Sequence, residues 1–81
     1  MHYVYILKSE RDPTKFYIGE TDNIERRLKE HANPKKSQYT FRYLPWILET
    51  HVSFNNKLVA KKFEAYLKTG SGRSFIKKHL I

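Results

Sequence analysis

Residues 3–8 read Tyr3-Val4-Tyr5-Ile6-Leu7-Lys8, and this stretch decides the fold. Its aromatic and β-branched residues are typical of a β-strand, and apolar side chains occur at both odd and even positions. A strand that is apolar on both sides has to be covered on both faces. We therefore expect residues 3–8 to form the central strand of a sheet that is packed between other elements.

The residues that follow predict a hairpin and then a helix. Asp12-Pro13 is typical of a turn, and residues 15–19 predict a second strand, antiparallel to the first, that ends at Gly19. The first helix is expected to run from Asp22 to about Ala32, with Asp22 as its N-cap and Glu25 completing a capping-box-like pair.

The second half of the chain predicts one more strand and two more helices. Residues 35–45 lack a clean period and predict an irregular loop, whereas residues 46–54 alternate between apolar and polar side chains as a half-buried strand does. A helix is expected over residues 57–69, with Gly70 as its C′ residue, followed by a short final helix. Two inward-facing sets are expected on these helices: Val59, Phe63, Tyr66 and Leu67, then Phe75, Ile76, His79 and Leu80.

These elements predict an α/β (α+β) fold in one domain, residues 1–81. The sheet is expected to be small, three-stranded and mainly antiparallel, flanked by helices in the order β-β-α-β-α-α. No apolar run approaches the ~20 residues that span a bilayer, and the chain has no cysteine for disulfides or thiolate zinc sites. We expect a cytoplasmic protein without a membrane partner.

The charge of the chain indicates a polyanionic partner. Sixteen Lys and Arg against eight Asp and Glu leave a net charge of +8 on 81 residues. The excess is concentrated in residues 50–81, which carry seven basic residues and a single acid, Glu64. A basic surface of this kind attracts nucleic acid. The alternative is a solvated face that serves only solubility.

Two features of the predicted first helix and first two strands suggest a reaction centre. Arg27 and His31 lie on the same helical stripe as Ile24 and Leu28, where burying an unpaired guanidinium would be costly. The alternative is that Arg27 lies at the edge of the stripe and extends to solvent. Tyr5 and Tyr17 would converge if the two strands form a hairpin, although tyrosine in strands more often packs than reacts.

The spacing of these residues resembles the signature of the GIY-YIG nuclease superfamily. The resemblance rests on Tyr3-Val4-Tyr5, on Tyr17-Ile18-Gly19, on Arg27 ten residues after Tyr17, and on His31 four residues further on. The chain looks most like small stand-alone bacterial GIY-YIG proteins, which are related to the N-terminal domain of the UvrC excision-repair nuclease. Pro45-Trp46 and the segment 67–75 extend the resemblance over nearly the whole chain.

The resemblance implies a role for each matching residue. Glu64 would bind a single divalent ion, Mg²⁺ or Mn²⁺, although it could instead form only an i, i+4 surface pair with Lys68. Tyr5 and Tyr17 would activate or orient the attacking water, and the choice between them stays open. Arg27 would steady the charge on the scissile phosphate. His31 could protonate a group, relay a proton or contact phosphate.

The implied activity is a divalent-metal-dependent endonuclease that hydrolyses DNA phosphodiester bonds, selective for structure, in DNA repair or recombination. DNA, or another nucleic acid, is the expected partner, and the expected contacts are Lys35, Lys36, Arg42 and Arg73. Glu20 stands where excision-repair relatives carry lysine. No residues remain for a separate DNA-binding domain, so targeting would come from the basic surface or from a protein partner.

The alternative function is a catalytically weak or inactive basic module that binds nucleic acid with the same fold. A third reading is an accessory protein whose charge serves only solubility. The oligomeric state is left open by the sequence.

Overall fold

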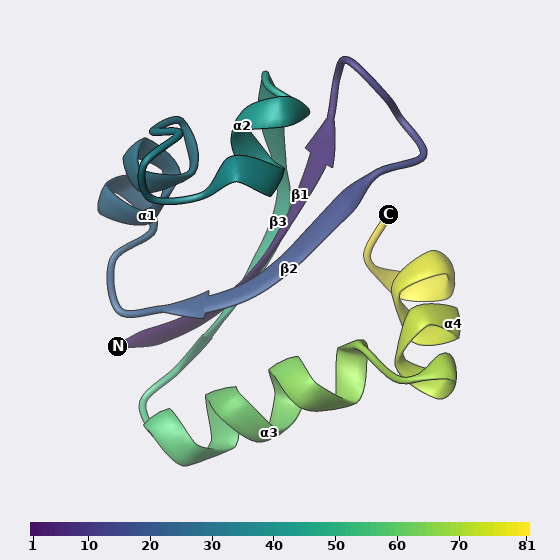
Figure 1. Ribbon diagram of the computed structural model, residues 1–81. Coiled ribbons are helices and arrows are strands. Elements are labelled where there is room, and N and C mark those ends of the chain that lie inside the picture. Colours follow the sequence, from purple (N-terminus) through teal and green to yellow (C-terminus); the bar gives the residue numbers. More distant parts are fainter.

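The computed structural model describes residues 1–81 as a three-stranded sheet between two pairs of helices. Figure 1 shows α1 and α2 on one side of the sheet and α3 and α4 on the other. The strands are β1 (His2–Ser9), β2 (Phe16–Thr21) and β3 (Trp46–Phe54). The helices are α1 (Ile24–His31), α2 (Gln38–Arg42), α3 (Lys57–Leu67) and α4 (Gly70–His79). The predicted fold class is confirmed.

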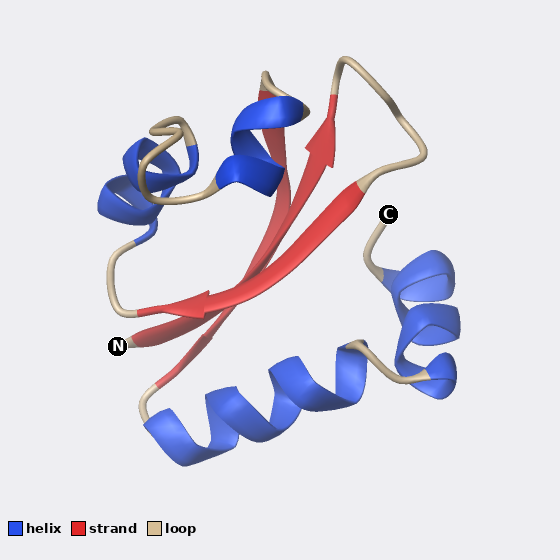
Figure 2. Cartoon of the chain, in the orientation of Figure 1, coloured by secondary structure: helices blue, strands red, loops and turns tan.

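The sheet has the order β2-β1-β3, and both pairings are antiparallel, so β1 is central as its apolar sequence predicts. The strands lie side by side and twist across the middle of the molecule in Figure 2. Tyr5 pairs with Gly19, and Leu7 pairs with Tyr17. Because side chains alternate along a strand, these four residues lie on one face of the sheet.

The hydrophobic core lies on the opposite face, beneath α3 and α4. It is one cluster of buried side chains: Val4, Ile6, Ile18, Ala60, Leu67 and Ile76. The two faces of the sheet therefore differ in what they contact. The even-numbered residues of β1 belong to the core, whereas its odd-numbered residues lie on the face covered by α1 and α2.

Two expectations about β2 and α1 were wrong in detail. Gly19 does not end β2, which continues to Thr21. The N-cap of α1 is Asn23, whose side chain accepts a hydrogen bond from the Arg26 amide, whereas Asp22 forms an i, i+4 ion pair with Arg26. Asn and Asp cap helices equally well, so composition alone could not choose between neighbours.

Residues 38–42 form a short helix inside the segment predicted as an irregular loop. No side chain caps this helix, and tertiary hydrogen bonds hold it instead. Thr40 is fully buried against His31, and the Trp46 indole donates to the Thr40 carbonyl oxygen at 2.6 Å. A helix stabilised by distant residues leaves no clear period in its own sequence.

The buried stripe of α3 differs from the predicted one. Ala60 and Leu67 are buried, Phe63 is half-buried, and Val59 and Tyr66 are exposed. The helix ends at Leu67, two residues earlier than predicted.

The start of α4 also differs from the prediction. Gly70 begins α4 rather than ending α3, with Thr69 as the N-cap. Of the four residues expected to face inward, Ile76 is buried, Phe75 and Leu80 are half-buried, and His79 is exposed. None of the helices combines the length and apolarity of a bilayer span.

Candidate active site

Tyr5 and His31 form the buried centre of the site, on the sheet face covered by α1. Each is 1% exposed, and the Tyr5 hydroxyl lies 2.7 Å from Nε2 of His31. The other ring nitrogen, Nδ1, lies 3.1 Å from the Thr40 hydroxyl. Burial, helped by the Arg27 charge, lowers the pKa of His31 to about 4. The ring is therefore neutral at pH 7. Because the Thr40 hydroxyl donates its hydrogen to the His31 carbonyl oxygen at 3.0 Å, we assign Nδ1–H as the donor to Thr40 and Nε2 as the acceptor from Tyr5.

Tyr17 and Arg27 form the outer part of the site. The half-buried Tyr17 ring packs edge-on against His31, with centroids 4.5 Å apart. Arg27 lies with Nη2 3.5 Å from the Tyr17 hydroxyl and donates from Nη1 to a Glu30 carboxylate oxygen at 3.1 Å. Burial alone would lower the pKa of Arg27, but the Glu30 and tyrosine oxygens hold that pKa above its usual value. Arg27 is thus a permanent cation beside a phenol oxygen.

The surroundings of Tyr5 oppose the loss of its proton. Burial raises the pKa of Tyr5, and the charges of Tyr17 and Glu64 raise it further, while Arg27 opposes these effects. Tyr5 therefore keeps its proton and points it at His31. Tyr17 lines an open depression of about 310 Å³ together with Tyr39, Lys68 and Arg73, so it is the tyrosine that solvent reaches.

Gly19 is required by the packing of the tyrosines. A Cβ atom at this position would lie 2.5 Å from the Tyr5 hydroxyl oxygen and 2.9 Å from Cε1 of Tyr17. Because the Tyr5 ring is enclosed on all sides, it could not move away without losing its bond to His31. The sequence suggested a strand end here, whereas the structure shows a position without room for a side chain.

Glu64 approaches the site from the other side of the sheet. It lies on α3, which packs against β1 and β2, and its side chain is 26% exposed. Its negative charge is one of the smaller causes that raise the pKa of Tyr5. It also pairs with Lys68 at 3.6 Å, the surface contact expected as the alternative.

The donor set fits a hard divalent cation held mainly by water and substrate. No group of three His, Asp or Glu side chains converges anywhere in the chain. Mg²⁺ in particular keeps several waters and takes one or two carboxylates plus phosphate oxygens, so Glu64 alone is a sufficient protein anchor. A structural zinc site, which needs four protein ligands, does not fit.

The residues expected to contact nucleic acid lie in different places. Arg73 shares the depression beside Tyr17. Lys35 and Lys36 are exposed in the turn between α1 and α2, and Arg42 is exposed at the end of α2. The structure therefore brings Arg73 to the candidate site and leaves the other three on an outer surface.

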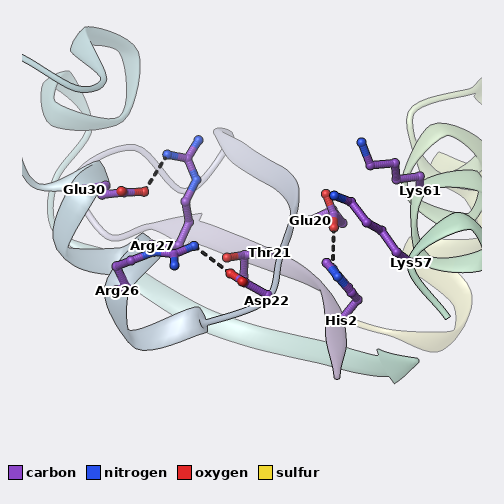
Figure 3. Close-up of a pocket in the computed structure, with 9 residues that line it drawn as sticks. All are labelled: His2, Glu20, Thr21, Asp22, Arg26, Arg27, Glu30, Lys57 and Lys61. Carbon is purple, nitrogen blue, oxygen red and sulfur yellow. Dashed lines mark hydrogen bonds and ion pairs between the residues drawn. The ribbon is translucent and has the colours of Figure 1, made fainter. Parts of the chain in front are cut away.

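Four residues near the site were missed by the sequence reasoning. Glu30 was detectable, because it stands three residues after Arg27 on the same helix. Thr40 carried no local signal, since only the tertiary fold brings it to His31. Lys57 and Lys61 line a polar groove with Arg27, shown in Figure 3. They are spaced i, i+4 on α3, which hinted at one shared face.

The chain is similar in sequence to a known domain family and to several of its members. A family model described as the GIY-YIG catalytic domain matches residues 1–78. A UPF0213 protein of Bacillus licheniformis is 43% identical over 67 residues, covering 83% of this chain and 67% of that protein. The structure-specific endonuclease subunit SLX1 of Debaryomyces hansenii is 36% identical over 83 residues, covering 95% of this chain but only 24% of the yeast protein.

One solved structure is similar over most of the chain. The solution NMR structure of a UPF0213 protein from Bacillus halodurans superposes with a TM-score of 0.57 at 32% identity, covering 95% of this chain and 82% of that one. The similarity of sequence and fold thus extends over α3 and the position of Glu64.

Proposed function

The chain belongs to the GIY-YIG catalytic domain family, and on this premise we propose that it is an endonuclease that hydrolyses DNA phosphodiester bonds with one divalent ion, Mg²⁺ or Mn²⁺. The observation that carries the proposal is the convergence of Tyr5, Tyr17, Arg27 and His31 on one face of the hairpin, with Glu64 approaching from α3. These five residues come from four elements, and packing alone does not require a guanidinium beside a tyrosine.

Tyr17 is the general base of the proposed reaction. Its side chain lines an open depression, and the Arg27 guanidinium lies 3.5 Å from its hydroxyl, where a permanent cation would offset the negative charge of a phenolate that accepts a proton. The water oxygen attacks phosphorus while its proton passes to Tyr17. The bond from phosphorus to the 3′ oxygen breaks, and the leaving oxygen takes a proton from solvent, which gives a 5′-phosphate and a 3′-hydroxyl.

Tyr5 and His31 hold and polarise the site from within. The side chain of His31 is too enclosed to contact phosphate, so we assign it the acceptor role toward Tyr5. This bond directs the Tyr5 proton inward and leaves the oxygen lone pairs on the Arg27 side.

Arg27 and Glu64 act on the phosphate. Arg27 donates to a non-bridging oxygen, a task for a planar donor that remains charged. Glu64 would hold the divalent ion, which when bound neutralises the phosphate and stabilises the leaving oxygen. Because the SLX1 relatives are named structure-specific endonuclease subunits, we propose the same kind of selectivity, a role in DNA repair or recombination, and a protein partner for targeting.

The test is nicking of supercoiled plasmid with Mg²⁺ or Mn²⁺ by identically prepared proteins. Glu64→Gln and Arg27→Ala should each slow nicking by about 100-fold or more, because each removes a charge that acts on the transition state. Glu49→Gln is the matched control, since Glu49 is exposed on β3 and forms no ion pair.

Equal nicking by the Glu64 and Glu49 variants would overturn the assignment of the metal ligand. DNA binding with no metal-dependent nicking by the unsubstituted protein would instead favour the binding-module function.

A further inference from the structure

A polar groove adjoins the reaction centre at the end of β2, with a volume of about 370 Å³. None of its nine lining residues is hydrophobic. Figure 3 shows its side chains converging from β1, from β2 and the turn after it, from α1 and from α3. Arg27 belongs both to this groove and to the site described above. The groove is therefore a continuation of the reaction centre.

The charges inside the groove are unevenly paired. Its three acids each have a partner: Glu20 with His2 at 2.7 Å, Asp22 with Arg26 at 2.7 Å, and Glu30 with Arg27 at 3.1 Å. The two lysines of the groove, Lys57 and Lys61, form no ion pair with any acid of the chain. The groove thus holds two lysines without an acidic partner, whereas each of its acids is bonded to a histidine or an arginine.

Glu20 should repel a bound phosphate less than its place next to Gly19 in the sequence suggested. Its carboxylate is 16% exposed and bonded to His2, and the side chain lies on the face of the sheet that α3 covers. The positive charge on this side of the site comes from α3 rather than from β2. Lys57 and Lys61 are separated by four residues, so both project from one face of the helix.

We propose that the groove is a phosphate-binding subsite, in which Lys57 and Lys61 bind the phosphodiester next to the scissile one. Lys61 and Glu64 are about one helical turn apart and Lys57 is one turn further, so the helix that carries the metal ligand also carries the subsite. A phosphate at Arg27 and Glu64 would place its neighbour beside these lysines, a short step along the backbone. Lysine suits this role, because it binds phosphate as a point charge without a fixed geometry.

This inference rests on the proposed function, since it assumes a phosphodiester substrate. The test compares two double variants of equal net charge, Lys57→Ala/Lys61→Ala and Lys62→Ala/Lys78→Ala. Lys62 and Lys78 are exposed on α3 and α4, line no groove and form no ion pair. Binding of a fluorescent DNA duplex is measured by anisotropy in EDTA, so that no cleavage occurs, over a series of salt concentrations. Thermal unfolding confirms that both variants are folded.

The groove variant should bind DNA about tenfold more weakly than the unsubstituted protein, with the slope of log K against log salt smaller by about one, because one phosphate contact is lost. The control variant should stay within about twofold of the unsubstituted protein. Equal affinities and slopes for the two double variants would overturn the subsite while leaving the nuclease proposal intact. If the unsubstituted protein shows no salt-dependent DNA binding, the subsite and the proposed function both fail.

Discussion

At the scale of single residues, Tyr5 and Tyr17 lie on the same face of the sheet in different surroundings. Tyr5 is 1% exposed and donates to His31, whereas Tyr17 lines an open depression beside Arg27. The inner hydroxyl is held by the protein and the outer one is available to a substrate water. Their roles should therefore separate when each oxygen is removed.

Tyr17→Phe should slow plasmid nicking by about 100-fold or more, the usual contribution of a general base, with little change in stability. Tyr5→Phe should instead lower the free energy of unfolding by about 1–3 kcal/mol, because the buried Nε2 of His31 loses its donor. Nicking rates and urea unfolding of both variants provide the comparison. If Tyr17→Phe nicks at the unsubstituted rate, water activation belongs to another group.

The burial of His31 makes stability depend on pH. Its pKa is about 4 in the folded protein against 6.5 in the free side chain, so the unfolded chain binds more protons between these values. Its contribution is complete above pH 6.5 and is lost as the pH falls toward 4, a change of about 3 kcal/mol at most.

Urea unfolding at pH 7 and pH 4.5 should show this loss in the unsubstituted protein and a smaller loss in His31→Gln. The glutamine amide can still meet Tyr5 and Thr40 but does not titrate. Carboxylates that titrate in the same range are common to both proteins, so the difference isolates His31. A His31→Gln variant with the same acid sensitivity would show that another group is responsible.

At the scale of elements, the contact between α3 and α4 depends on one glycine. A Cβ atom at Gly72 would lie 1.9 Å from the Tyr66 carbonyl oxygen and 2.5 Å from the Leu67 Cα. Both atoms belong to the backbone of α3 and cannot turn aside. Gly70, two residues earlier in the same helix, has nothing within 4 Å of its Cβ position. Substitution of the two glycines by alanine therefore distinguishes the effect of close helix packing on stability from the effect of helix propensity.

Gly72→Ala should lower the free energy of unfolding by at least about 1–3 kcal/mol, the usual cost of overpacking, because α4 has to move away from α3. Gly70→Ala should raise it by about 0.4–1 kcal/mol, since alanine restricts the unfolded chain and the backbone there is not in the left-handed region. Urea unfolding of the two variants, or thermal unfolding, measures whether each substitution raises or lowers the free energy of unfolding. Equal effects at the two positions would mean that the close approach is not maintained in solution.

At the scale of the whole molecule, a single small core joins the sheet to α4 and to α3, the helix that carries Glu64. Fourteen of the 81 residues are buried, and the apolar cluster contains only six of them. A domain of this size has a small stability margin. The core also positions Glu64, the proposed metal ligand, because α3 packs on β1 and β2 through Leu67 and Ala60.

Leu67→Ala should lower the free energy of unfolding by about 2–5 kcal/mol, because it leaves a cavity at the centre of the cluster. Leu58→Ala on the same helix should change it by less than about 0.5 kcal/mol, since Leu58 is 69% exposed. Urea unfolding monitored by circular dichroism measures both. A small effect at Leu67 would contradict the single-core description.

The sequence by itself determined the elements whose signal is local. The alternation of residues 46–54 predicted β3 with its observed bounds, and the two-sided apolar run at residues 3–8 predicted the central strand. The helical stripe of Ile24, Arg27, Leu28 and His31 predicted a helix with one face toward the sheet and left open whether Arg27 lies on that face or at its edge. These predictions succeeded because period and composition act through neighbours along the chain.

Only the tertiary structure decided which side chains meet and which positions have no room. It formed α2 from a segment without a period, paired His31 with Thr40, and brought Lys57 and Lys61 beside Arg27. It also explains why two positions have to be glycine. A Cβ atom at Gly19 would meet an aromatic ring on a neighbouring strand, and one at Gly72 would meet the backbone of a neighbouring helix. Contacts of this kind join residues far apart in the chain, and they exist only after the sheet has twisted and the helices have docked.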